Sequence, residues 1–344
     1  MGFWQQILSS LAPEVQILDM PPLVSGDPVP DRIRQLTALG LEAARIGQVD
    51  EALDHFQQAI ALNPEYATSY YNRGSLRYDQ QDLEGALEDF NQALRLNPSL
   101  AVAYVNRGLV WVDLEDYASA LPDFDQAIRL QPEVPRFYIN RALVRLELGD
   151  PHGALADYDQ TLALAPSFVE GYINRGLTRQ QLGDLPGSLM DFDRAVQLQP
   201  TWALAYHCRG QVRGELGDYP QAIVDFSHTL RLDPDDTRAY VNRGVARSFL
   251  GQYDLALADL QRAIDHNPLL VDAYFSRGQV HLEIGDWLTA EEDFSVVLRL
   301  QPAHADAWQC RGLARQQLGR LEASLQDLEQ ATRIRLEQCY QQPS

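Results

Sequence analysis

Eight prolines recur along this chain at a constant spacing of 34 residues, and this period restricts the fold more than any other feature. Each follows a segment such as QAIALNP or QALRLNP, where a proline ends a helix because it lacks an N–H and clashes with the preceding turn. A fixed period of this length predicts a stack of similar supersecondary units. The prolines are Pro64, Pro98, Pro132, Pro166, Pro200, Pro234, Pro268 and Pro302.

Other positions of the period are restricted once the proline is placed at position 32. Position 8 is Gly or Ala, position 20 is Ala or Ser, and position 24 is Phe, Tyr or Leu. Small residues allow two helices to approach closely, and the large residue fills the space beside them. Pairs such as Gly149-Asp150 indicate a turn near position 15. Each unit is therefore predicted to contain two antiparallel helices.

This pattern resembles the tetratricopeptide repeat, which has a bulky residue at position 4, small residues at 8 and 20, an aromatic residue at 24 and proline at 32. The resemblance implies an all-α fold, an α-solenoid formed as a right-handed superhelix of nine tandem helix–turn–helix repeats. Residues 1–32 are expected to form a short helix and a proline-rich linker. The helix is expected to cap the first repeat; occupancy of the groove or disorder are the alternatives. The repeats are expected at 33–66, 67–100, 101–134, 135–168, 169–202, 203–236, 237–270, 271–304 and 305–338, followed by a tail of residues 339–344.

The ninth repeat departs from the others at its end, where Leu336 stands in place of proline. Its second helix should therefore continue to about Cys339 or Tyr340.

The charge balance limits the classes of partner. The chain has 28 basic and 48 acidic residues, a net charge of −20, and every basic residue is arginine. This excess disfavours nucleic acid and anionic membranes, and it favours a basic protein partner. The three cysteines lack metal-ligand spacing and suit a reducing compartment. No apolar stretch is long enough to span a bilayer, so we expect a cytoplasmic protein, or one peripheral to an internal membrane.

Position 7 is arginine and position 23 is aspartate in the same eight repeats, while the first repeat has Leu39 and His55 instead. This co-occurrence predicts an ion pair between the two helices of one repeat, and cross-repeat contacts stay open. Breaking a buried pair costs about 3–5 kcal/mol, so we expect a structural role; a row of binding arginines is the alternative. The pairs include Arg107–Asp123, Arg141–Asp157, Arg175–Asp191 and Arg243–Asp259.

In the tetratricopeptide family, the inner groove is lined by positions 2, 5, 6, 9, 12 and 13. An asparagine recurs at position 6, and its amide can both donate to and accept from an extended backbone. The row resembles the asparagine ladder of some peptide-binding members; local hydrogen bonds within the stack are the alternative. Position 5 is mostly apolar, and we expect it to face solvent as part of the peptide site; burial of part of it by packing between repeats is the alternative. The candidate residues are Asn72, Asn106, Asn140, Asn174 and Asn242 at position 6, and Tyr71, Val105, Ile139, Ile173 and Phe275 at position 5.

The residues at two groove positions restrict the class of ligand that the groove is expected to bind. Position 13 is acidic in five repeats, which gives the groove an acidic margin, and position 5 carries no Lys or Arg, which argues against the family's carboxylate clamp for chaperone C-termini. The expected function is a non-catalytic scaffold that binds an extended, apolar and basic segment of a partner protein. An assembly or maturation factor, suggested by similarity to bacterial-type arrays with the YxNRG motif, and a self-associating structural protein are the alternatives.

The chemistry-bearing residues indicate no enzyme. The seven histidines fall at scattered positions of the period without an HExxH motif, and the glycines belong to the repeat and form no phosphate-binding loop. We therefore expect no catalytic activity, no metal and no cofactor.

Overall fold

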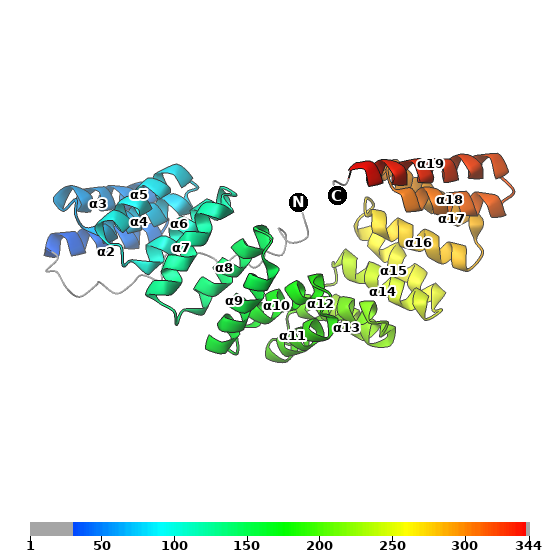
Figure 1. The fold of residues 1–344 in the computed structure, drawn as a ribbon, viewed down its shortest axis with the longest axis horizontal. Coiled ribbons are helices and arrows are strands. Elements are labelled where there is room, and N and C mark those ends of the chain that lie inside the picture. Colours follow the sequence, from blue (N-terminus) through cyan, green and yellow to red (C-terminus); the bar gives the residue numbers. More distant parts are fainter. Residues whose placement is uncertain (1–29, 342–344) are drawn as a thin grey trace. The chain divides into compact units, whose positions relative to one another are not determined.

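The computed structural model describes residues 30–341, and every regular element in this range is an α-helix (Figure 1). The helices divide into two compact units, one extending to Thr178 and the other beginning at Arg179, so that the boundary lies inside α10. The helix and linker expected at the N-terminus fall on residues up to 29, which lie outside the described residues. The helices are α2 (Asp31–Arg45), α3 (Val49–Leu62), α4 (Ala67–Asp79), α5 (Leu83–Leu96), α6 (Ala101–Asp113), α7 (Tyr117–Leu130), α8 (Pro135–Glu147), α9 (Pro151–Leu164), α10 (Val169–Gln181), α11 (Leu185–Leu198), α12 (Ala203–Glu215), α13 (Tyr219–Leu232), α14 (Thr237–Phe249), α15 (Tyr253–His266), α16 (Val271–Glu283), α17 (Trp287–Leu300), α18 (Ala305–Gln317) and α19 (Leu321–Gln341).

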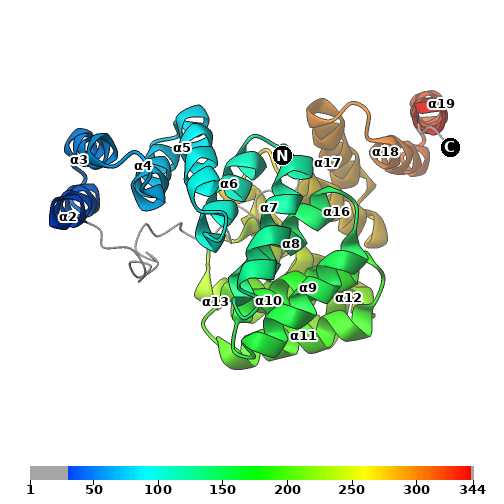
Figure 2. The same ribbon diagram turned by 60° about the vertical axis from the view of Figure 1, so that its left-hand side comes forward.

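Within each unit the helices pack as consecutive pairs. In unit 1, α4 packs on α5 and α6 on α7, and in unit 2, α12 packs on α13 and α14 on α15. The second helix of a pair also contacts the first helix of the next pair; Figure 2 shows this for α3 and α4, which lie side by side. Each unit is thus a stack of helical pairs in chain order. The all-α solenoid that the family resemblance implies is confirmed.

A glycine and an aspartate build the turn inside most pairs. Gly149 has φ 77°, which lets the chain leave α8 without a steric penalty. The side chain of Asp150 then accepts a hydrogen bond from the Gly153 N–H at 2.9 Å and so caps the start of α9. Two pairs lack the glycine, and there Gln81 and Glu115 take φ 62° and 58°. The turn therefore sets the backbone conformation even where the residue is unfavourable for it.

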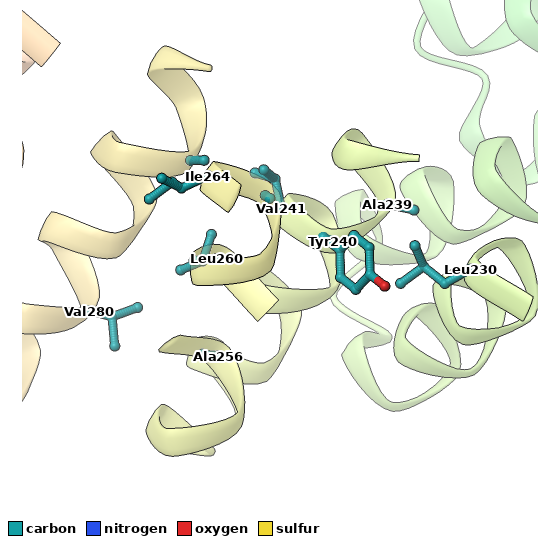
Figure 3. Close-up of a cluster of buried hydrophobic side chains, with 10 residues drawn as sticks. Leu230, Ala239, Tyr240, Val241, Ala256, Leu260, Ile264 and Val280 are labelled. Atoms are coloured by element: carbon teal, nitrogen blue, oxygen red, sulfur yellow. The ribbon is translucent and has the colours of Figure 1, made fainter. Parts of the chain in front are cut away.

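The buried core continues from one pair to the next. A Cβ added at Gly108 would lie 2.9 Å from the Phe124 ring, which explains the small residue at position 8 and the aromatic at position 24. Figure 3 shows one such cluster in unit 2, where Leu230, Val241 and Val280 come from α13, α14 and α16. No pair can bury its apolar surface alone, so adjacent pairs stabilise one another.

The last helix, α19, extends over 21 residues to Gln341, close to the end expected from the missing proline. In the part of the chain that the structure describes, no helix has both the length and the apolar character needed to cross a bilayer.

Candidate functional site

The aspartate at position 23 is held by the arginine at position 7 of the same pair. Arg107 donates to Asp123 from Nε at 2.9 Å and from Nη2 at 2.6 Å, and its Nη1 donates to Asn91 of the preceding pair at 2.7 Å. Its guanidinium lies 5.5 Å from the centroid of the Tyr104 ring. Burial raises the pKa of Asp123, and the bonds from Arg107 oppose that rise. The same two bonds join Arg141 to Asp157 at 3.0 and 2.5 Å, and Arg243 to Asp259 at 2.9 and 2.7 Å.

A second arginine, at position 11, contacts the same aspartate in most pairs. Asp225 accepts from Arg209 at 3.0 and 2.6 Å and from Arg213 at 2.8 Å. This second arginine was not predicted from the sequence; Trp111 and His281 replace it in two of the pairs that carry the aspartate, and the first pair, which has no such aspartate, has Ala43. A buried carboxylate with two cationic partners is better compensated than one with a single partner. The second arginines are Arg77, Arg145, Arg179, Arg213, Arg247 and Arg315.

The arginines of position 7 are engaged within the stack. Arg175 donates to Asp159 of the preceding pair at 2.6 Å, and Asp191 accepts from Arg179 at 2.8 Å. The pairing of Arg175 with Asp191 stays a prediction. Because each of these arginines has acceptors inside the stack, the structure favours the structural interpretation over a row of binding arginines.

Four of the five asparagines of position 6 lie in the interior of the stack, and Asn242 is half-buried. Asn72, Asn106, Asn140 and Asn174 are only 3–8% exposed. The Asn106 amide donates to Tyr71 Oη at 3.3 Å, which is the local bonding that the sequence left open. The Nδ2 atoms of Asn72 and Asn140 have no hydrogen-bond partner among the described residues. The row is therefore mixed, with some amides satisfied inside the stack and others not.

The expectation that position 5 faces solvent is wrong. Tyr71, Val105, Ile139 and Ile173 are all buried, and Phe275 is half-buried with its ring 5.7 Å from the Phe294 ring. Successive first helices lie against one another, as α4 does on α6 and α14 on α16. That contact covers position 5 with apolar side chains of the neighbouring pair. These residues stabilise the stack and do not form an open stripe.

On the first helices of unit 2, the open hollows lie at positions 9, 12 and 13, closer to the C-terminal end of each helix than position 5. We call the surface formed by these positions on α12, α14 and α16 the first-helix face. A hollow of about 470 Å³ lies between α12 and α14 and is lined by Gly214, Glu215 and Asn242, among others. A second hollow of about 400 Å³ lies between α14 and α16 and is lined by Ser248 and Glu283. Val245 and Phe249 line both hollows, so the two adjoin.

Small residues at position 12 create the two hollows. This position is Gly214 in α12 and Ser248 in α14, where other first helices carry Tyr78, Val112 or Leu146. A Cβ added at Gly214 would meet no atom within 4 Å. Neither residue was predicted from the sequence, although Gly214 and Ser248 are the two small polar or glycine residues at this position, where the first repeat has Ala44.

Phe249 is the other departure from the repeat. It stands at position 13, which is acidic in five repeats, and its side chain is 65% exposed. It stacks on Tyr219 with a centroid distance of 4.5 Å and an interplanar angle of 4°. An exposed, ordered aromatic between two hollows is typical of a binding surface.

Nothing in the described part of the chain is arranged as a metal centre, since no three His, Cys, Asp or Glu side chains there are grouped to hold an ion. His207 has hydrogen-bond partners at both ring nitrogens: its Nδ1 lies 3.0 Å from Asp236 Oδ2, and its Nε2 lies 3.4 Å from Asn242 Nδ2. His207 is buried, so this cluster packs the interior.

The sequence matches models of known repeat families over most of its length. One tetratricopeptide repeat model matches residues 37–101, 105–167, 139–201 and 246–305, and a second matches residues 305–338. The chain belongs to the tetratricopeptide repeat family. It is therefore a protein-interaction scaffold in its general class. No curated protein matches the sequence.

Solved structures share the fold. A tetratricopeptide repeat protein from Parabacteroides merdae is 21% identical with a TM-score of 0.55, over 72% of this chain and 98% of that one. The C-terminal part of a tetratricopeptide repeat protein from Cytophaga hutchinsonii is 16% identical with a TM-score of 0.58, over 70% and 98%. YrrB, described as a tetratricopeptide repeat protein with an unusual peptide-binding site, is 27% identical with a TM-score of 0.48, over 54% and 95%. The first two likenesses show the fold alone, and the third, with a TM-score below 0.5, shows neither the fold nor a function of this chain.

Proposed function

We propose that this scaffold binds an extended segment of a partner protein along the first-helix face. The observation that carries the proposal is the pair of adjoining hollows between α12, α14 and α16. They lie on consecutive first helices and share Val245 and Phe249, so one peptide crossing the helices would enter both. Hollows with apolar walls and a few polar groups suit side chains of such a peptide.

Peptide binding by the asparagines of unit 1 stays a prediction. The Nδ2 atoms of Asn72 and Asn140 donate to no partner among the described residues, but they are buried, so a ligand's backbone carbonyl would have to enter the stack to reach them. Asn106 already donates to Ser75 at 3.2 Å.

The proposal is tested by closing the first hollow. Gly214→Leu places a side chain where a Cβ has open space, so the fold should be unharmed. Leucine has the higher helix propensity, so the melting temperature should stay or rise. Binding of fluorescein-labelled degenerate dodecapeptide pools to the full chain is measured by fluorescence anisotropy. We expect at least about tenfold weaker binding, equivalent to 1.4 kcal/mol.

Gln221→Leu is the matched control. It adds the same leucine to an exposed position of α13, in the same pair but on the second helix, and it should leave binding unchanged. The proposal is wrong if no pool binds the wild-type chain saturably, or if Gly214→Leu binds like the wild type. The cytoplasmic location, the lack of catalytic activity and the apolar and basic character of the partner stay predictions.

A further inference from the structure

Three first helices of unit 2 end beside one another with an unusual set of residues. The last residues of α12, α14 and α16 are Glu215, Phe249 and Glu283, all at position 13 of the repeat. The first of these helices contacts the second, and the second contacts the third. The three ends therefore form one local surface, with an aromatic between two carboxylates.

The aromatic is held in place yet open. One face of the Phe249 ring stacks on Tyr219 at a centroid distance of 4.5 Å, which fixes its orientation. The side chain as a whole is still 65% exposed, although burying a phenylalanine stabilises a protein by about 1.5–3 kcal/mol. Phe249 thus offers an ordered, flat apolar surface to a ligand. We call Phe249, Tyr219, Glu215 and Glu283 the Phe249 platform.

The charge around this surface is negative and uncompensated. Glu215 lines the hollow on one side of Phe249 and Glu283 lines the hollow on the other. Neither forms an ion pair among the residues that the structure describes; Glu215 accepts only from the neutral Gln180 amide, at 2.5 Å. The C-terminal ends of three helices add the negative ends of their dipoles. The position-11 arginines of α12 and α14, Arg213 and Arg247, are bound to Asp225 and Asp259.

We infer that the Phe249 platform binds an arginine side chain of the partner's extended segment, an inference that rests on the proposed function. A planar guanidinium stacks on the open face of the Phe249 ring, and the carboxylates of the two flanking hollows supply the negative charge that attracts it. An apolar side chain would cover Phe249 but leave both carboxylates unpaired. A lysine would satisfy the charge, but its ammonium is compact and strongly hydrated, so it stacks less well.

The test compares peptide pools that differ in one central residue. Fluorescein-labelled dodecapeptide pools with a fixed central arginine, citrulline, lysine or glutamate are titrated with the full chain at low and moderate salt. Citrulline keeps the shape of arginine without its charge. We expect the arginine pool to bind about tenfold more tightly than the citrulline pool, with a smaller difference at higher salt.

Two variants separate the contributions of charge and stacking. The double variant Glu215→Gln, Glu283→Gln should reduce the arginine preference to below about twofold while leaving the citrulline pool unchanged. Phe249→Ala should weaken the arginine and citrulline pools together, since both stack. Because these three side chains are exposed, circular dichroism should show an unchanged fold. Met190→Ala, at a 72% exposed position of α11, is the control and should leave all pools unaffected.

The outcomes distinguish this inference from the function on which it rests. Equal binding of the arginine and citrulline pools to the wild type would overturn the arginine site and leave peptide binding intact. The same holds if the double glutamine variant keeps the preference. If no pool binds at all, the proposed function itself fails.

Discussion

Replacing one position-7 arginine should destabilise its pair by an amount that depends on position 11. In Arg107→Ala, the buried Asp123 loses both of its charged hydrogen bonds, and Trp111 offers no replacement. In Arg209→Ala, Asp225 keeps the bond from Arg213 at 2.8 Å. The two variants remove the same side chain from equivalent places, so their difference isolates the second arginine.

The size of each effect follows from the contacts. Leaving the buried Asp123 carboxylate without its cation should cost about 3–5 kcal/mol, to which the lost contact with Tyr104 adds about 0.5–1 kcal/mol. Arg209→Ala should cost about 1–2 kcal/mol less, because a counter-charge remains. Without Arg107, the pKa of Asp123 rises further above its unfolded value of about 3.9. The stability of that variant therefore falls as the pH rises through about 4 and above, and the loss is smallest in acid.

Local opening has to be measured, because a repeat array need not unfold in one step. Hydrogen exchange of peptides from residues 101–130 and 203–232 reports the opening free energy of each pair. Arg129→Ala, at an exposed position of α7, is the control and should change it by less than about 0.5 kcal/mol. Equal losses in Arg107→Ala and Arg209→Ala, or a coupling below about 0.5 kcal/mol in the Arg107–Asp123 double-mutant cycle, would refute the reasoning.

Three further predictions concern single sites. Burial raises the pKa of Asp79 to about 6, so the folded protein loses stability as the pH rises from about 4 to about 6. Asp79→Asn should remove this pH dependence in thermal melts and raise the melting temperature at pH 7; an unchanged pH profile would contradict the prediction. Glu115→Gly, at φ 58°, should raise the free energy of unfolding in urea melts by about 0.5–1 kcal/mol, whereas Gly149→Ala, at φ 77°, should lower it by a similar amount. Shifts in the same direction in both variants would contradict backbone strain as the cause. Burial raises the pKa of Cys208 to about 12, so a disulfide reagent at pH 8 should label the exposed Cys339 first and Cys208 only after denaturation, as read by mass spectrometry; rapid labelling of Cys208 would disprove its burial.

The helical pairs could be predicted because their determinants are local and repeated. Gly108 and Phe124 are 16 residues apart and meet inside one pair, so the 34-residue period alone fixes their relation. The contact between Arg107 and Asp123 has the same separation and follows from the same periodicity. A contact between two residues of one pair can therefore be predicted from an alignment of the repeats.

Contacts between pairs could not be read in this way. Asn106 donates to Tyr71, 35 residues earlier, and whether such positions meet depends on the rotation between consecutive pairs. The period does not specify that rotation. Position 5 was therefore expected on the surface, whereas Val105 packs in a cluster with Phe137 of α8 and is buried. The error concerns which side of a first helix the next pair covers.

The candidate site contains residues that are unfavourable for the local stability of the fold. Gly214 lies near the end of α12, where glycine costs up to about 1 kcal/mol relative to alanine, and no neighbouring atom requires it since its Cβ would meet nothing within 4 Å. The glycine at position 8, by contrast, is required by the ring beside it. Phe249 exposes an aromatic where seven of the other repeats have a carboxylate or amide and the first has Arg45. Gly214 has no packing cause, and Phe249 stays largely exposed although one face of its ring stacks on Tyr219; a ligand in the hollow that both residues line explains the two choices best.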